Sequence, residues 1–217
     1  MIRWRKLDAE HVSRYTFHER AIHFIVAVTC IYLVLSGLAL YTPFLFWLSS
    51  ILGGPAPMRL FHPVLGLLYF IFLVYMWWMW RRDLRFNQSD KAWMLNMEAY
   101  ITNHDDDLLP IERWNAGQKI FFWMMMASGV GLFVSGFVLW FPEYVPWSLQ
   151  WIKFLAILLH SVCAFVSIGG LMIHLYMGIF LVKGGFRQIV TGEVTRAWAY
   201  HHHRLWLERV TKEHPDG

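Results

Sequence analysis

Four long apolar runs, separated by polar segments, dominate the pattern of hydrophobic and polar residues along this chain. They cover about residues 22–41, 60–80, 120–140 and 154–182. An α-helix needs about 20 mainly apolar residues to cross a bilayer, and each run reaches that length. Ten-residue segments of alternating polarity, which would indicate a membrane β-barrel, are not visible. The pattern therefore predicts four transmembrane helices.

Polar sequence surrounds these runs. The polar segments are 1–21, the long loop 81–119 and the tail 183–217. Within the long loop we expect a short interfacial helix around 92–101 and a solvated turn at Asp105–Asp107. Residues 1–217 are predicted to form a single membrane domain, in which these polar segments flank and connect the four spans.

Composition supports a membrane protein. The 217 residues are 57% hydrophobic and 18% aromatic, with a mean hydropathy of +0.39. These values predict an all-α polytopic membrane protein rather than a soluble domain. Cys30 and Cys163 lie inside apolar runs, so neither a disulfide framework nor a four-thiolate iron–sulfur cluster is expected. We read no cleaved signal peptide, because about twenty polar residues precede the first run.

The basic residues indicate an orientation. If both termini lie on one side, that side holds 17 of the 19 Lys and Arg residues, and only Arg59 and Lys153 lie opposite. The positive-inside rule then places both termini and the loop 81–119 in the cytoplasm. The net charge of +4 thus reflects membrane topology rather than a surface for nucleic acid.

A weak internal repeat links the two halves. The tetrapeptide at 34–37 resembles that at 133–136, and each contains Ser-Gly shortly before an aromatic residue and a proline. Gly37 lies 25 residues before His62, and Gly136 lies 24 residues before His160. The two helical hairpins could derive from one duplicated unit, in which His62 and His160 would be equivalent.

Histidines inside the apolar runs are the main candidates for chemistry. His160 and His174 are 14 residues apart in the last run, so on a helix they share a face and differ in depth by about 21 Å. Ionisable residues within a membrane are costly and usually functional. The predicted topology places His62 and His160 in the outer half and His23 and His174 in the inner half.

Two pairs of histidines at two depths match two bis-histidine haems stacked across a bilayer. Such iron has no open position, which favours electron transfer. The sequence therefore predicts a four-helix bundle that holds two b-type haems. The alternative is that these histidines only bond across helices. His18 is a rival to His23, and Pro63 favours an interpretation in which His62 stands at a helix start.

Two further motifs are ambiguous. Asn115-Ala116-Gly117-Gln118-Lys119 opens the third run, and its Asn and Gln have the spacing of a capping box. The same amides could bind a quinone ring near His174. His201–His203 in the tail could bind a metal, although a solvated interfacial helix or a partner contact is favoured.

The chain resembles the cytochrome b (gamma) subunits of membrane-bound respiratory formate dehydrogenases along nearly its whole length. The matching segments are RAIHF (20–24), RLFHPVLG (59–66), WNAGQK (114–119), SGFVLWFP (135–142), LLHS (158–161), IHLYMGIFLVKG (173–184) and EVTRAWAYHHHRLW (193–206). Their order and spacing make the resemblance specific. Related subunits of nickel–iron hydrogenases and thiosulfate reductases share the plan of four helices and four histidines.

The resemblance implies a multi-pass protein of the bacterial cytoplasmic (inner) membrane with an outer haem on His62 and His160 and an inner haem on His23 and His174. It also implies a menaquinone or ubiquinone site near His174, formed with Asn115, Gly117 and Gln118. The implied partners are an iron–sulfur (beta) subunit with its own membrane helix and a molybdenum or tungsten catalytic (alpha) subunit, with a higher oligomer of the heterotrimer possible. Electrons would pass to quinone, while formate oxidation would belong to the catalytic partner.

Two other functions compete with this interpretation. The chain could be the cytochrome b subunit of a hydrogenase or thiosulfate reductase, which would bind haem but respond to another electron donor. More remotely, it could be a haem-free transporter or scaffold that uses buried histidines for packing.

Overall fold

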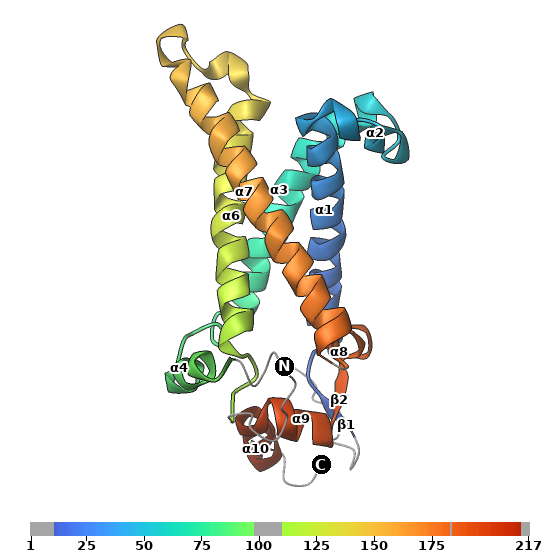
Figure 1. The fold of residues 1–217 in the computed structure, drawn as a ribbon, viewed down its shortest axis with the longest axis vertical. Coiled ribbons are helices and arrows are strands. Elements are labelled where there is room, and N and C mark those ends of the chain that lie inside the picture. The colour runs from blue at the N-terminus through green and yellow to red at the C-terminus, as the bar shows by residue number, and fades with distance from the viewer. Residues whose placement is uncertain (1–10, 98–109, 183, 214–217) are drawn as a thin grey trace. The chain divides into compact units, whose positions relative to one another are not determined.

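The computed structural model describes residues 11–97, 110–182 and 184–213, and most of them are helical (Figure 1). Among these residues, four helices are long and apolar enough to cross a membrane. They are α1 (Phe17–Tyr41), α3 (Pro55–Trp80), α6 (Ala116–Trp140) and α7 (Trp151–Leu175), and α7 continues as the π-helix η5 (Tyr176–Leu181). The predicted all-α membrane fold is confirmed.

The helices begin before the apolar runs do. Helix α3 starts at Pro55, a residue well suited to the first helical position because its φ is fixed and its missing N–H is not needed there. The two preceding glycines, Gly53 and Gly54, have φ values of 86° and 106° and turn the chain into the helix. His62 therefore lies inside α3, and its interpretation as a helix-start residue is wrong. Pro63 is accommodated within the helix.

Short elements connect the long helices. On the connection from α1 to α3 they are η1 (Pro43–Leu45) and α2 (Leu48–Ile51), and from α6 to α7 they are η3 (Pro142–Tyr144) and η4 (Trp147–Leu149). The long loop contains α4 (Gln88–Leu95), which begins earlier than the expected 92–101 because Asn87 and Asp90 form a capping box. The expected turn at Asp105–Asp107 lies outside the described residues.

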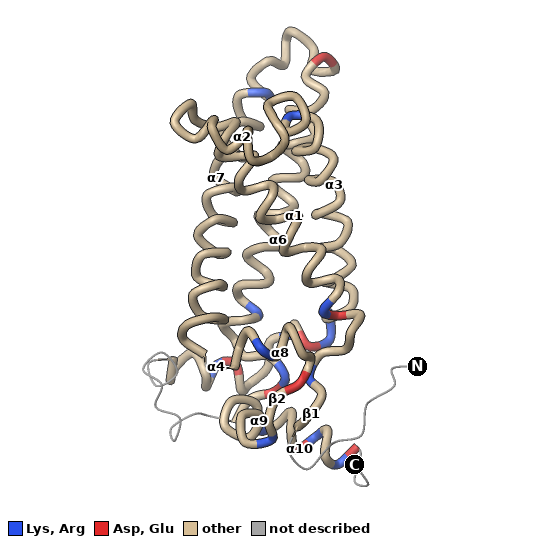
Figure 2. Tube along the Cα trace, turned by 90° about the vertical axis from the view of Figure 1, so that its right-hand side faces the viewer, with Lys and Arg blue, Asp and Glu red and all other residues tan. Residues whose placement is uncertain are grey.

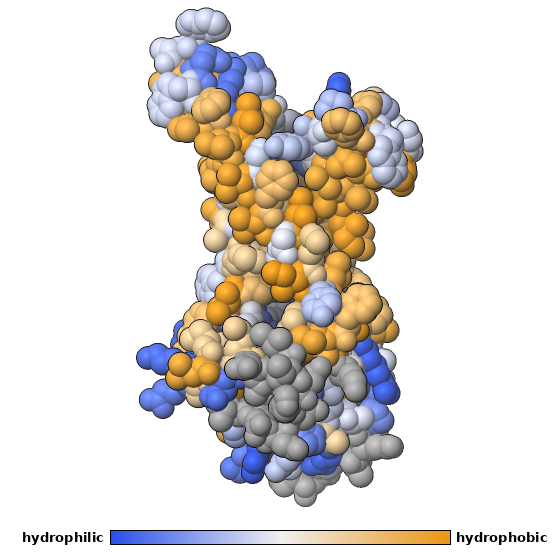
Figure 3. Space-filling model, viewed as in Figure 1, coloured by the Kyte–Doolittle hydropathy of each residue, from blue (hydrophilic) through white to orange (hydrophobic). Residues whose placement is uncertain are grey.

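The chain divides into two units. The membrane unit comprises residues 21–79 and 123–172, and contains most of the four long helices. Charged residues of these helices fall near their ends (Figure 2), and in the space-filling view apolar residues dominate the surface along the long helices (Figure 3). Large apolar side chains on every helix point outward, such as Val28, Ile71, Val134 and Val162. Such an exterior suits lipid rather than water.

The second unit, here called the polar unit, comprises residues 1–20, 80–122 and 173–217. Its strand β1 (His11–Ser13) pairs antiparallel with β2 (Glu193–Thr195), and α8 (Gly185–Thr191), α9 (Arg196–His202) and α10 (Arg204–Glu213) surround the pair. A small core consists of Val12, Val194, Ala199, Trp206 and Val210. The strands were not predicted, because three residues are too few to show a periodic pattern.

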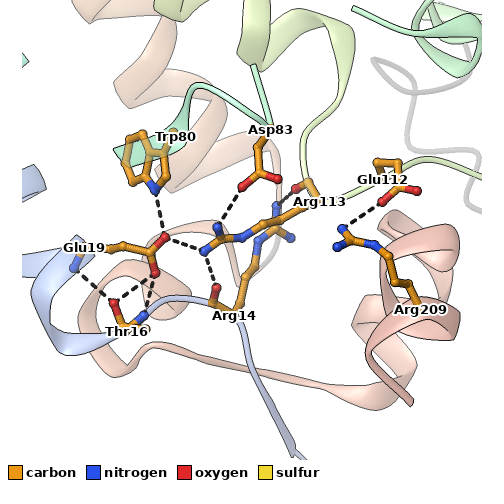
Figure 4. A network of polar contacts seen from close by, with 8 residues as sticks. All are labelled: Arg14, Thr16, Glu19, Trp80, Asp83, Glu112, Arg113 and Arg209. Carbon is orange, nitrogen blue, oxygen red and sulfur yellow. Dashed lines mark hydrogen bonds and ion pairs between the residues drawn. The ribbon is translucent and has the colours of Figure 1, made fainter. Parts of the chain in front are cut away.

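A network of polar contacts ties three distant segments of the polar unit together (Figure 4). The Arg113 guanidinium donates to Glu19 at 2.8 Å and to Asp83 at 2.9 Å, and Trp80 Nε1 donates to Glu19 at 2.8 Å. Burial disfavours the charge of Arg113, but the neighbouring Glu19 and Asp83 carboxylates outweigh that cost and raise its pKa. The network fixes the start of α1 against the end of α3 and the segment before α6.

Candidate haem site

His62 on α3 and His160 on α7 lie opposite each other inside the membrane unit. Their ring centroids are 6.4 Å apart, with 58° between the ring planes. The two residues are 98 positions apart in the sequence. The fold therefore brings together the two histidines that the predicted topology placed in the outer half.

A serine hydroxyl bonds to one nitrogen of each ring. Ser36 Oγ lies 2.7 Å from Nδ1 of His62, and Ser135 Oγ lies 3.0 Å from Nδ1 of His160. Each hydroxyl proton is directed to a carbonyl one turn earlier, at Tyr32 (2.8 Å) and at Gly131 (2.6 Å). The hydroxyl therefore accepts from Nδ1–H, which leaves the Nε2 lone pair of each imidazole available to a metal.

The internal repeat explains this symmetry. Ser36-Gly37 and Ser135-Gly136 are the repeated dipeptides, and each repeat orients the histidine of its own hairpin. An added Cβ at Gly37 would lie 3.5 Å from His62 Cε1, and one at Gly136 would lie 3.3 Å from His160 Cε1. The glycines thus let the helix backbones approach the rings closely, more tightly at Gly136.

The two histidines line a cavity of about 530 Å³ in the membrane unit, a volume typical of small-molecule and cofactor sites. Its walls are mostly apolar and come from all four long helices; they include Leu33, Val34, Leu132, Phe133, Phe137 and Ala164. A flat apolar macrocycle with a metal at its centre is chemically suited to such a space.

The spacing of the rings provides a test of that fit. Imidazole nitrogens bind first-row metals such as zinc at about 2.0–2.1 Å, and the ring centre lies about 1.1 Å beyond the nitrogen. Each ring centre is therefore about 3.15 Å from the metal, and two imidazoles that face each other across one metal have centroids about 6.3 Å apart. The observed separation of His62 and His160 is 6.4 Å. His62 and His160 therefore have the spacing of two residues that would hold a haem iron between them.

The other two candidate ligands lie in different units, so their pairing stays a prediction. His23 is on α1, where its ring contacts Phe24 edge to face. His174 is on α7, and its ring stacks on Phe121 of α6 with centroids 4.5 Å apart and planes 3° apart. His18, the rival to His23, lies on the exposed side of the first turn of α1.

The motif that opens α6 forms a capping box. The backbone N–H of Gln118 donates to Asn115 Oδ1 at 2.8 Å, and the backbone N–H of Asn115 donates to Gln118 Oε1 at 3.1 Å. Both side-chain oxygens are thus used by the helix end. The NH₂ groups of both amides are the parts of the motif left to interact with a ligand, and Gly117 stands between them.

The tail histidines belong to the packing of the polar unit. His203 is 2% exposed, and its Nδ1–H donates to the carbonyl of Glu112 at 2.7 Å. Burial, together with the positive charge of Arg14, lowers the pKa of His203 well below its usual value. His202 packs on Trp198. The expectation of a solvated helix is wrong for His203, which closes α9 inside the core.

Three residues that contact the candidate histidines were not identified from the sequence. Ser36 and Ser135 were noted only as part of the repeat, although a Ser-Gly pair about 25 residues before each histidine was the available signal. Phe121 carried no signal at all, because one phenylalanine at the start of an apolar run is ordinary. Its stacking on His174 depends on how α6 packs against α7.

Comparisons with known proteins agree with this geometry. The family described as prokaryotic cytochrome b561 matches residues 14–192. The chain is 36% identical over 203 residues to the formate dehydrogenase cytochrome b556(fdo) subunit of Escherichia coli, covering 93% of this chain and 94% of the relative. It is 29% identical over 201 residues to the nitrate-inducible cytochrome b556(Fdn) subunit of the same organism, at 93% and 92% coverage.

A third relative is the formate dehydrogenase cytochrome b556 subunit of Haemophilus influenzae, 31% identical over 205 residues, with 93% of this chain and 85% of the relative covered. The matches extend over the four long helices and both histidines of the cavity. The chain therefore belongs to the prokaryotic cytochrome b561 family.

Proposed function

We propose that this chain is the di-haem cytochrome b subunit of a respiratory formate dehydrogenase, and that it transfers electrons from an iron–sulfur partner subunit across the membrane to quinone. The observation that carries the proposal is the His62–His160 pair. Its ring centroids are 6.4 Å apart, both Nδ1 atoms are held by serines, and the pair lines an apolar cavity.

A haem with two imidazole ligands supplies one-electron transfer. The work of this chain's own residues is to hold it. His62 and His160 would bind the iron through Nε2, while Ser36 and Ser135 fix the ring tautomers and raise the basicity of the ligands. The mostly apolar walls would surround the haem with a medium of low polarity. His23 and His174 would hold a second haem nearer the cytoplasm.

Quinone would bind where α6 begins. Asn115, Gly117 and Gln118 stand at that end, and the stacked pair of Phe121 and His174 belongs to the same unit. The amide NH₂ groups of Asn115 and Gln118 can donate to a quinone carbonyl, while Phe121 offers an aromatic face. With both termini cytoplasmic, as the positive-inside rule predicts, protons for quinone reduction would come from the cytoplasm.

The partners follow from the relatives. Each is named as a cytochrome b556 subunit of formate dehydrogenase. A catalytic subunit and an iron–sulfur subunit are therefore the expected partners, with formate oxidised in the catalytic one. A cytochrome b subunit of a hydrogenase or thiosulfate reductase is the alternative. Formate, rather than hydrogen, should reduce the b haems in native membranes if the proposal is right.

The direct test is a haem count on purified variants. A pyridine haemochrome assay should give two b haems per wild-type chain, and His62→Ala or His160→Ala should remove one of them. His201→Ala is the matched control, because this exposed histidine lies on α9. A wild-type count of zero would refute the proposal and favour a haem-free transporter or scaffold.

The inner pair and the quinone site need separate variants. His174→Ala should remove one haem and abolish quinone reduction, while dye-linked formate oxidation by the partner continues. Asn115→Ala tests the quinone contact. Unchanged quinone kinetics in that variant would mean that Asn115 serves only as the helix cap.

A further inference from the structure

One charged residue lines the cavity between His62 and His160. In the part of the chain that the structure describes, Arg59 is the only Lys, Arg, Asp or Glu whose side chain borders this space. The other lining residues are the two histidines and residues without a charge, most of them apolar. Arg59 lies near the start of α3 and is exposed, so its guanidinium can reach a ligand at this end of the cavity.

Arg59 is placed to act on whatever His62 binds. It precedes His62 by three residues on α3, so both side chains project from the same side of the helix. It also borders the smaller hollow formed by Thr42, Pro43 and Phe46 on the connection that follows α1. Across residues 11–97, 110–182 and 184–213, its guanidinium forms neither a hydrogen bond nor an ion pair.

The chemistry of a b haem supplies the missing partner. Its porphyrin carries two carboxylate side chains, and the apolar walls of the cavity cannot neutralise them. An arginine binds a carboxylate through two parallel hydrogen bonds and stays charged at every physiological pH. We infer that Arg59 binds a carboxylate of the haem held by His62 and His160, an inference that rests on the proposed function.

The two hairpins differ at the residue three places before the histidine, and this difference determines which side of the cavity the haem carboxylates would face. The residue three places before His160 is Ile157, so α7 offers no equivalent cation. Lys153, the other basic residue on this side, does not line the cavity. The carboxylate edge of the haem is therefore turned toward α3 and the connection after α1. The two halves of the repeat thus supply equivalent histidines for the iron, but only the first half supplies a cation for the haem carboxylates.

The contact has a redox consequence. A reduced b haem carries one more negative charge than the oxidised form, so a nearby guanidinium favours reduction. The outer haem is the first to receive electrons from the partner in the proposed function. Arg59 thus makes that haem a better electron acceptor, in addition to fixing its orientation.

The test is a potentiometric titration of the b haems in the purified complex. Arg59→Met removes the charge and keeps an apolar stem of similar length. At a given ambient potential, the ratio of reduced to oxidised outer haem should fall roughly tenfold, a shift of about 59 mV for a one-electron couple. Arg59→Lys should recover most of that shift, because it restores the charge.

Lys153→Met is the matched control, because it removes the other basic residue of the same side without touching the cavity wall. It should leave both haem potentials unchanged. If the outer haem of the Arg59→Met complex has the wild-type midpoint potential, the inference is wrong. Arg59 would then bind a lipid phosphate rather than the haem. Because the wild type still binds two haems in that case, the proposed function would stand.

The pH dependence of the same potentials provides a second measurement. The haem has two carboxylates and Arg59 would keep one of them ionised, so the outer-haem midpoint of the wild type should vary less between pH 6 and 8 than that of Arg59→Met. Equal pH dependence in the two complexes would contradict the inference.

Discussion

The hydrogen bond from His62 to Ser36 should control how tightly the proposed outer haem is held. In Ser36→Ala the Nδ1–H of His62 loses its acceptor. Ser36 is fully buried, so water cannot replace the hydroxyl. An unsatisfied buried donor costs about 1–3 kcal/mol, which corresponds to about a 5- to 150-fold change in equilibrium. The loss of a hydrogen-bond partner of a metal-bound histidine typically costs about 10- to 100-fold in metal affinity, in agreement.

The assay is haem transfer from the purified complex to excess apomyoglobin, followed by the pyridine haemochrome content that remains. If the chain binds the two proposed haems, one of them should leave Ser36→Ala faster by that factor, and the other should leave at the wild-type rate. The midpoint of the affected haem should rise, because a less basic imidazole stabilises the oxidised iron less. This shift is opposite in sign to that expected of Arg59→Met.

Thr29→Val on the same helix is the control. The Thr29 hydroxyl also donates to the carbonyl one turn earlier, at 2.7 Å, and is buried, but among the described residues it forms no hydrogen bond to a histidine. If Ser36→Ala and Thr29→Val release haem equally slowly, the hydroxyl of Ser36 serves only its own helix, and the argument for an orienting hydrogen bond fails.

Three further predictions concern the glycines, a buried ion pair and pH. Gly136→Ala should lower the occupancy of the proposed outer haem more than Gly37→Ala. The new Cβ would lie 3.3 Å from His160 Cε1 in the first variant and 3.5 Å from His62 Cε1 in the second. The haem content per purified chain measures the occupancy, and equal occupancy in the two variants would contradict the prediction. Lys119→Met should cost about 3–5 kcal/mol of stability, because it leaves Asp90 buried without its 2.8 Å partner. Thermal unfolding in detergent measures that loss, and Arg204→Ala, which breaks a half-exposed pair with Glu208, should cost less than about 1 kcal/mol. The polar unit should lose stability as pH falls below about 6.5, by up to 1.4 kcal/mol per pH unit. The reason is that burial lowers the pKa of His203, so below this pH the unfolded chain binds a proton at His203 and the folded chain does not. His203→Gln should flatten that dependence of the unfolding temperature between pH 7.5 and 5.5, and an unchanged slope would assign it to other groups.

The sequence alone determined the class of fold and the identity of the candidate ligands. Apolar runs of about 20 residues specify membrane helices because a bilayer leaves a backbone no other way to satisfy its polar groups. Histidines within such runs are identifiable because ionisable groups are rare there. Helix direction then gave the depth of each histidine, and this paired His62 with His160 before any contact was known.

Helix boundaries were less predictable, because they depend on caps rather than on hydrophobicity. The capping box of Asn87 and Asp90 starts α4 before any apolar residue does, and Pro55 starts α3 ahead of its apolar run. The β1–β2 pair joins residues about 180 positions apart through strands of three residues. Such a pairing leaves no periodic signal, since it is stabilised by the surrounding core.

Only the tertiary structure decided the environment of the ligands. Whether Ser36 faces His62, whether Phe121 stacks on His174 and whether Arg59 lines the cavity depend on the rotation of each helix about its own axis. That rotation is set by packing against neighbouring helices, and sequence spacing along one helix does not specify it. The sequence identifies the candidate ligands. The packing of the helices determines which nitrogen of each is free, which charge lies nearby and what space remains for a cofactor.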